Sequence, residues 1–275
     1  MEMQKLVVRE QIVKKVVKSG NGGAVWVPKS WLGQEVVVIL PEKQKLGIRE
    51  KIVHLLEPYL KYIVAAGIYG SYARNEQTDE SDIDLLVITK DKNLRLDFKE
   101  EKIEITSFPI DKFRMAIERH PAVYYQAVQE IEPLVNGYVF EELRNIKIAN
   151  ASFRGYLKET REHIKSNREF LELDRMDGAY LKSYSALYSS ILRLRGLFVI
   201  RCILDKSSFS NKNFRNWLVG SGLSSNEFAE SYKAYCLVRG GEKASMLKIR
   251  IDVAEKVLNI LERELSLLEA RVNGK

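Results

Sequence analysis

The sequence has little cysteine, histidine or proline and no long apolar run. Its 275 residues include 2 Cys and 6 Pro. Cys202 and Cys236 have no metal-ligand spacing, so they predict buried thiols in a reducing cytoplasm rather than disulfides or zinc ligands. No stretch approaches the roughly 20 apolar residues of a membrane span, and the N-terminus lacks the features of a signal peptide. The expected protein is cytoplasmic, without a membrane partner.

Positive charge exceeds negative charge, and the excess is unevenly distributed. The net charge is +7, from 44 Lys and Arg against 37 Asp and Glu. Residues 1–45 carry +4, residues 46–147 carry −4 and residues 148–275 carry +7. A basic segment beside an acidic one suits a polyanion such as a triphosphate or RNA. The excess is mild, so a solvated Lys- and Arg-rich surface explains it equally well.

A glycine turn follows an apolar run in the first third of the chain. Residues 62–69 are apolar and bounded by glycine, which is typical of a buried strand. Gly70 and Ser71 come next, where a backbone without a β-carbon can approach a ligand closely. Arg74 lies on the short helix that this turn would open, whose amides face an anion. Arg74 is a candidate phosphate ligand, although it is equally suited to pair with Glu76 or Asp79.

Two aspartates stand on the strand after this turn. Asp82 and Asp84 are two residues apart, so their side chains point to the same face. Two carboxylates this close are costly to ionise together without cations, and hard oxygen ligands suit Mg²⁺. The pattern predicts phosphoryl transfer from a nucleoside triphosphate with metal assistance.

The Gly-Ser turn, the spacer and the Asp-x-Asp strand resemble the signature of the DNA polymerase β-like nucleotidyltransferase superfamily, most closely its minimal branch. The resemblance covers about residues 46–110. It implies that Asp82 and Asp84 bind two Mg²⁺ ions, while Gly70 and Ser71 hold the β- and γ-phosphates of a nucleoside triphosphate, with ATP as the first candidate.

The same resemblance implies a third carboxylate on a neighbouring strand. Residues 102–106 alternate with a period of two, which makes Glu104 the candidate for this catalytic and metal-binding position. Asp97, Glu100 and Glu101 lie nearby and are alternatives. The family's usual glycine after Arg74 is replaced by Asn75, a residue that also suits a turn.

The N-terminal segment predicts a small β unit. Its pattern is a strand over 11–18, a glycine-rich turn, a strand over 24–28, a helical turn at 29–33 and a strand over 35–40. Roughly 30 residues cannot bury a core alone, so the unit must pair with a copy of itself or pack on the rest of the chain.

Residues 18–32 resemble the swapped-hairpin, AbrB-like modules of transcription regulators and antitoxins, and still more closely small archaeal proteins. The resemblance implies a homodimer and possible DNA contact through Lys14, Lys15 and Lys18. Three lysines bind phosphates without reading bases, so a dimerising role is favoured over sequence-specific DNA binding.

Helical periodicity dominates the remainder of the chain. Helices are predicted over 44–59, 110–119 and 121–130, and strand character over 134–138. Beyond residue 150 the predicted helices are 152–173, 178–205, 211–219, 225–239 and 244–272. A bundle in this place resembles the substrate domains of aminoglycoside nucleotidyltransferases and HEPN-type helical partners. Lys182 and Tyr184 are candidates for holding base and triphosphate, with simple packing as the alternative.

The sequence therefore predicts an α+β protein of three domains: a small β module over 1–43, a polymerase β-like nucleotidyltransferase domain with a mixed sheet over 44–150, and a helical bundle over 151–275. The predicted function is transfer of a nucleotide from a triphosphate to an acceptor hydroxyl with release of pyrophosphate, the acceptor being RNA or protein. The alternative is a DNA- or partner-binding, antitoxin-like regulatory protein with an inactive nucleotidyltransferase fold.

Overall fold

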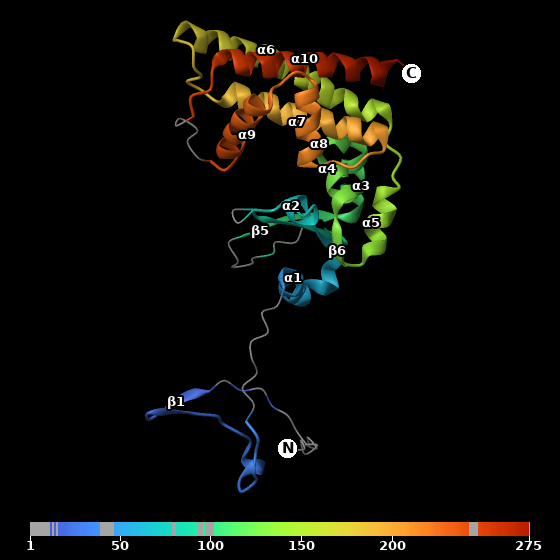
Figure 1. Cartoon of the computed structure of the whole chain (residues 1–275). Coiled ribbons are helices and arrows are strands. Elements are labelled where there is room, and N and C mark those ends of the chain that lie inside the picture. The colour runs from blue at the N-terminus through green and yellow to red at the C-terminus, as the bar shows by residue number, and fades with distance from the viewer. Residues whose placement is uncertain are drawn as a thin grey trace, which may run out of the picture. The chain divides into compact units, whose positions relative to one another are not determined.

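The computed structural model describes residues 12, 14, 16–38, 47–78, 81–92, 96, 102–241 and 247–274. The chain divides into two compact units, residues 1–45 and 46–275 (Figure 1). The sheet and the long helices both belong to the second unit. The further division predicted at residue 150 stays a prediction.

The first unit contains one short hairpin. Strands β1 (Val17–Ser19) and β2 (Gly22–Ala24) pair antiparallel, and a 3-10 turn, η1 (Lys29–Trp31), follows. The predicted strand over 35–40 is wrong in its described part, because residues 35–38 form no strand. Trp26 and Val38 are 74% and 72% exposed. Within the described part of this unit, these apolar side chains do not pack against a second layer of structure. The alternating pattern alone therefore does not produce a hydrogen-bonded strand pair.

A mixed four-stranded sheet forms the centre of the second unit. Its order is β5 (Ile103–Pro109), β4 (Ile83–Thr89), β3 (Ile63–Tyr69) and β6 (Glu132–Val135). β4 pairs antiparallel with β3 and parallel with β5, and β6 pairs antiparallel with β3. This confirms the predicted mixed sheet and α+β class.

Both faces of the sheet are buried, which explains why its strands are apolar runs. Ile52 and Leu56 of α1 (Ile48–Leu56) pack with Leu85 and Val87 on one face. Side chains of α3 (Ile110–Arg119), α4 (Pro121–Glu130) and α5 (Gly137–Arg144) cover Leu86 and Ile88 on the other. The helices predicted over 110–119 and 121–130 are confirmed. A 3-10 helix, η2 (Glu57–Tyr62), leads into β3, and the short helix α2 (Gly70–Ala73) follows it.

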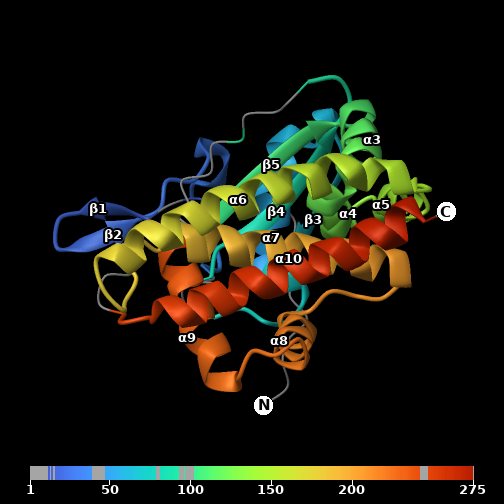
Figure 2. The ribbon, with the colours of Figure 1, turned by 90° about the horizontal axis from the view of Figure 1, so that it is seen from above.

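The remaining helices pack into a bundle around a single apolar core. They are η3 (Asn150–Phe153), α6 (Arg154–Met176), α7 (Ser185–Asp205), α8 (Asn211–Gly220), α9 (Ser225–Arg239) and α10 (Ile251–Asn273). Helices α6 and α10 lie side by side along α7 (Figure 2). No helix in the described part of the chain combines the length and apolarity that crossing a membrane requires.

Two predicted helix starts are wrong. Helix α7 begins at Ser185 rather than at 178, and α10 at Ile251 rather than at 244. The segments before them pair with each other: the Leu181 amide donates to the Ile249 carbonyl at 2.9 Å and the Ile251 amide to the Ala179 carbonyl at 3.0 Å. This pairing satisfies backbone groups that a longer helix would otherwise have bonded internally.

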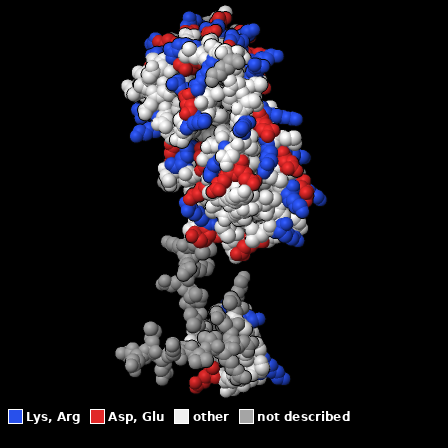
Figure 3. Space-filling view, turned by 90° about the vertical axis from the view of Figure 1, so that its right-hand side faces the viewer, with Lys and Arg blue, Asp and Glu red and all other residues white. Residues whose placement is uncertain are grey.

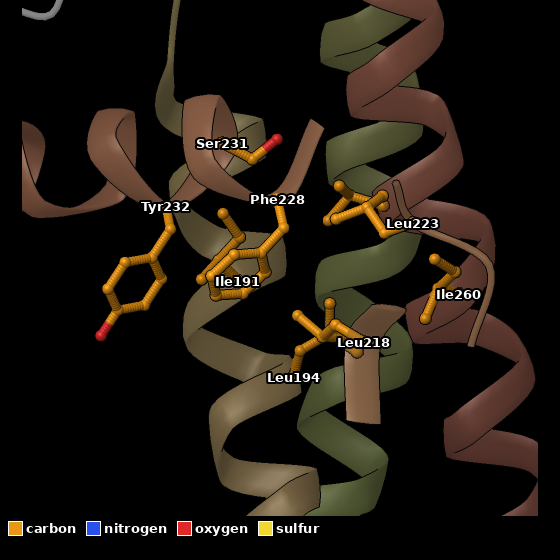
Figure 4. A pocket seen from close by; sticks show the side chains of 9 residues that line it. Ile191, Leu194, Leu218, Leu223, Phe228, Ser231, Tyr232 and Ile260 are labelled. Carbon is orange, nitrogen blue, oxygen red and sulfur yellow. The ribbon is translucent and has the colours of Figure 1, made fainter. Parts of the chain in front are cut away.

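The bundle interior is closely packed. A cavity of only about 10 Å³ lies among Ile191, Leu194, Leu218 and Phe228 (Figure 4). That space is about the minimum for one water molecule, so it cannot hold a small-molecule ligand. Between α6 and α7, a Cβ at Gly196 would lie 1.7 Å from the Tyr156 hydroxyl oxygen. Glycine at this position lets the Tyr156 ring lie against the α7 backbone.

Candidate active site

The register of β3, β4 and β5 brings two of the predicted carboxylates, Asp84 and Glu104, to the same end of the sheet, and we call this end the strand edge. Asp84 on β4 pairs with Tyr69 of β3 on one side and with Glu104 of β5 on the other. Burial, followed by repulsion from Glu104, raises the pKa of Asp84 to about 6, and the guanidinium of Arg239 on α9 offsets part of this effect. The strand edge therefore contains two adjacent carboxylates whose joint ionisation is unfavourable.

The glycine turn lies directly against this edge. Gly70 has a φ of +76°, and a Cβ built on it would fall 1.9 Å from Oδ2 of Asp84. Only glycine adopts this backbone conformation without strain and leaves room for the carboxylate. Ser71 follows at the second position of α2 and is half-buried. The predicted turn and the predicted aspartate are thus in contact.

A carboxylate that the sequence did not indicate holds the turn. Glu130, the last residue of α4, accepts a hydrogen bond from the Gly70 amide at 2.8 Å and one from Nη1 of Arg74 at 2.7 Å. Nε2 of Gln126 donates to the same carboxylate at 3.1 Å. Gly70 and Glu130 are 60 residues apart in the sequence, and no local pattern connects them.

Arg74 is engaged by two carboxylates. Besides Glu130, it donates from Nε to Oε2 of Glu76 at 2.9 Å, and its side chain is only 13% exposed. Its guanidinium carbon lies 5.5 Å from the centre of the Phe209 ring. The alternative pairing of Arg74 with Glu76 is therefore present, and in this arrangement its donors point to carboxylates.

The bundle reaches the turn through Asn211. Its backbone amide and its Nδ2 donate to the two oxygens of Glu76 at 3.0 and 2.9 Å. Its Oδ1 accepts a hydrogen bond from Nη1 of Arg195 at 3.0 Å. Asn211 was not predicted as a site residue, because a contact across 135 residues leaves no trace in local spacing.

A pocket of about 330 Å³ opens beside Glu130. The loop after α7 lines it with Lys206, Ser207 and Ser208, and Gln129 of α4 lines the opposite side. An ammonium group, hydroxyls and an amide are donors that suit phosphate oxygens. This pocket lies next to the turn that the sequence assigned to phosphates.

The other predicted binding residues lie elsewhere. Lys182 pairs with Asp177 at 2.9 Å, and the buried Tyr184 donates its hydroxyl hydrogen bond to the Leu247 carbonyl. Both precede α7, in the segment where the predicted helix start was wrong, and no contact of the described residues joins them to Asp84. In the first unit, Lys14 and Lys18 are exposed, whereas Lys15 lies outside the described residues.

The carboxylates at the strand edge are the candidate ligands of the predicted Mg²⁺. Within the described ranges, no three side chains of His, Cys, Asp or Glu are grouped closely enough to hold a metal ion. Asp84 and Glu104 form an adjacent pair, and Asp82 is exposed just before β4. The pair fits a divalent cation, because two repelling carboxylates with hard oxygen donors are stabilised by Mg²⁺. The number of ions stays a prediction.

Charges of both signs cover the molecular surface beside the sheet and the bundle. Figure 3 shows Lys and Arg side chains interspersed with Asp and Glu on one face. Among the described residues on that face, the positive charge of the bundle does not gather into one continuous patch. The predicted RNA acceptor therefore gains no support from this face.

Comparison with known proteins agrees with this geometry. Residues 50–136 match the model of the family described as polymerase beta, nucleotidyltransferase. The match begins within α1 and ends directly after β6, so it spans the sheet, the turn and Glu130. This stretch is therefore similar to the polymerase β-type nucleotidyltransferase family. The AbrB-like character of residues 18–32 stays a prediction.

No curated protein matches the chain. Two solved structures are similar to it at 16% sequence identity. A nucleotidyltransferase-like protein from Exiguobacterium sibiricum 255-15 has a TM-score of 0.36, over 82% of this chain and 78% of that one. A spectinomycin adenyltransferase from Enterococcus faecialis, solved with ATP and spectinomycin, has a TM-score of 0.42, over 78% of this chain and 97% of that one.

Proposed function

We propose that the protein transfers a nucleotide from a nucleoside triphosphate, with ATP as first candidate, to the hydroxyl of a macromolecular acceptor. Glu104 takes the proton of the acceptor hydroxyl, the acceptor oxygen attacks the α-phosphorus, the bond from that phosphorus to the bridging oxygen breaks, and pyrophosphate leaves. RNA and protein are the proposed acceptors. The proposal extends the nucleotidyltransferase family assignment of residues 50–136 to a reaction.

One observation carries the proposal: the Asp84 carboxylate touches the glycine turn. Oδ2 of Asp84 occupies the space that any side chain at position 70 would need. A phosphate bound at the turn would therefore lie beside the carboxylates on β4 and β5. Catalysis of phosphoryl transfer depends mainly on such positioning and on charge stabilisation.

Each residue of the site has a proposed role. Asp84 and Glu104, with Asp82 ahead of them, would hold Mg²⁺, which when bound supplies charge neutralisation at the phosphates. Gly70 and Ser71 would hold the β- and γ-phosphates, with Lys206 as an added cation from the neighbouring pocket. Arg74 acts on this turn indirectly, through Glu130 and Glu76.

The test is a transfer assay on the purified full chain. The protein is incubated with Mg²⁺, each α-labelled triphosphate and total RNA, and both RNA and protein are examined for label. Asp84→Asn is the inactive variant, and Asp91→Asn is its matched control, because Asp91 is exposed in the turn after β4. Label that depends on Asp84 but not on Asp91 supports the proposal.

Equal labelling by Asp84→Asn and the unchanged protein contradicts the proposed site. Absence of label with every triphosphate contradicts transfer to RNA or protein. The competing proposal, a DNA- or partner-binding regulator, is supported by the exposed Lys14 and Lys18. DNA binding at physiological salt without any labelling would favour it.

A further inference from the structure

We infer that Asn211 is a positioning residue for the phosphate-binding turn: from the first turn of α8, it holds Glu76 and, through Glu76, Arg74 in place. The kinetic consequence rests on the proposed function. The structural part rests only on contacts between described residues of the second unit.

Asn211 binds both oxygens of one carboxylate. Its backbone amide donates to Oε1 of Glu76 at 3.0 Å, and its side-chain Nδ2 donates to Oε2 at 2.9 Å. The Glu76 side chain is 22% exposed, so solvent competes weakly for it. Two donors from one residue fix the position and the plane of the carboxylate.

The fixed carboxylate in turn holds Arg74. Oε2 of Glu76 also accepts from Nε of Arg74 at 2.9 Å, while Nη1 of Arg74 donates to Glu130. Glu130 binds the Gly70 amide. A continuous series of hydrogen bonds therefore connects α8 with the turn that contacts Asp84.

The orientation of the Asn211 amide is itself determined. Its Oδ1 accepts from Nη1 of Arg195 at 3.0 Å and from the Tyr232 hydroxyl at 3.3 Å. Donors surround the oxygen and an acceptor meets the nitrogen, so the amide has one satisfactory orientation. Arg195 is held in turn by aromatic rings, with its guanidinium carbon 5.0 Å from the centre of the Phe209 ring.

These contacts make Asn211→Asp a selective change. The aspartate keeps an oxygen for Arg195 and Tyr232 but places a second negative charge against Glu76. Its exposed neighbour on the same helical turn supplies the matched control, Asn213→Asp. The control makes the same chemical change at the start of α8, away from Glu76.

The first measurement is steady-state transfer with MgATP. Asn211→Asp should lower kcat/KM by about tenfold to a hundredfold, because a small misplacement of positioning groups has effects of that size. Most of the change should lie in KM for MgATP, and Asn213→Asp should stay within about threefold of the unchanged protein.

The second measurement is hydrogen exchange of the backbone amides in residues 70–76, which requires no turnover. These amides include the Arg74 amide bonded to the Gly70 carbonyl at 3.2 Å and the Glu76 amide bonded to the Ser71 carbonyl at 2.9 Å. Asn211→Asp should accelerate their exchange by about tenfold or more, and Asn213→Asp should leave it unchanged.

The two measurements separate the two ideas. Accelerated exchange in a protein that never transfers nucleotide would support the positioning role and contradict the proposed function. Active Asn211→Asp protein with unchanged KM and unchanged exchange would overturn the positioning role. Loss of activity without a local change in exchange would also overturn it.

Discussion

The strand edge and the turn of the candidate site lie against each other but differ in their charges: like charges are adjacent at the strand edge, whereas opposite charges are paired in the turn. On β4 and β5, Asp84 and Glu104 are adjacent and repel each other, which contributes to the raised pKa of Asp84. In the turn, Arg74 is paired with both Glu76 and Glu130. The turn is therefore organised before any ligand arrives, whereas the strand edge is more stable once a cation neutralises it. This difference distinguishes the turn, which is a preformed structural element, from the strand edge, whose carboxylates are the candidate metal ligands.

The largest expected effect is on catalysis at the strand edge. Asp84→Asn removes one charge of the repelling pair and should lower kcat/KM by about 10³-fold. A loss of this size corresponds to the several kcal/mol by which a metal-binding carboxylate stabilises a phosphoryl transition state. The fold should be preserved, because removing the charge also relieves repulsion. Steady-state transfer assays and circular dichroism measure the two effects, with Asp91→Asn as control. An active Asp84→Asn protein would contradict the catalytic assignment.

Gly70→Ala tests the contact between the two parts. The left-handed φ of +76° and the overlap with Oδ2 of Asp84 should together lower the free energy of unfolding by roughly 2–4 kcal/mol. Gly241 has nearly the same φ, +75°, and no atom of the described residues within 4 Å of its Cβ position, so Gly241→Ala should show the backbone strain alone, about 1–2 kcal/mol. Urea unfolding of both variants gives the comparison. Equal losses would mean that the carboxylate moves away without penalty.

A pH series tests the burial and the repulsion from Glu104 that together raise the pKa of Asp84. The pKa of Asp84 is raised from 3.8 to about 6 on folding, so the folded state binds this proton more tightly than the unfolded state. The resulting stability is complete below about pH 4 and is lost as the pH rises through 6. With allowance for solvent screening, the loss should be about 1–2 kcal/mol by pH 7.5.

Mg²⁺ should restore more of this stability at pH 7.5 than at pH 5, because the ion binds the ionised form. Urea unfolding with EDTA or with Mg²⁺ at the two pH values measures the difference, and Asp84→Asn should abolish it. An equal effect of Mg²⁺ on the variant would place the ion elsewhere.

The smallest effect is expected far from the site. Arg168 on α6 and Glu262 on α10 form an ion pair at 2.6 Å, with side chains 45% and 52% exposed. Exposed pairs contribute little, so Arg168→Ala should change the free energy of unfolding by at most about 0.5 kcal/mol. Thermal or urea unfolding measures it. A larger loss would show that this ion pair contributes substantially to the packing of α6 against α10.

The place of the glycine turn beside Asp84 could be predicted from the sequence because its determinants are local. Gly70 and Asp84 lie on neighbouring elements, whereas the place of Glu104 beside Asp84 was implied by the family resemblance and depends on the parallel register of β4 and β5. Proline at 109 and 121 marked the starts of α3 and α4. These helix starts require no knowledge of the rest of the chain.

The turn was predicted only in part because its partners are distant in the sequence. Glu130 and Asn211 are ordinary residues at the end of one helix and the start of another, and only the tertiary fold brings Glu130 to Gly70 and Asn211 to Glu76. Lys182 was predicted on a helix, but backbone pairing with the segment before α10 stops that helix from starting. Helical propensity cannot reveal such long-range competition.

The contact between Gly196 and Tyr156 constrains how this chain can change over evolutionary time. Any side chain at position 196 would overlap the tyrosine ring, whereas a smaller residue at 156 would leave position 196 free to vary. The order of the two substitutions therefore matters: replacing Gly196 first forces the tyrosine ring to move, whereas replacing Tyr156 first removes the overlapping atoms. Among relatives, glycine at 196 should occur with many residues at 156, but tyrosine at 156 should occur almost only with glycine.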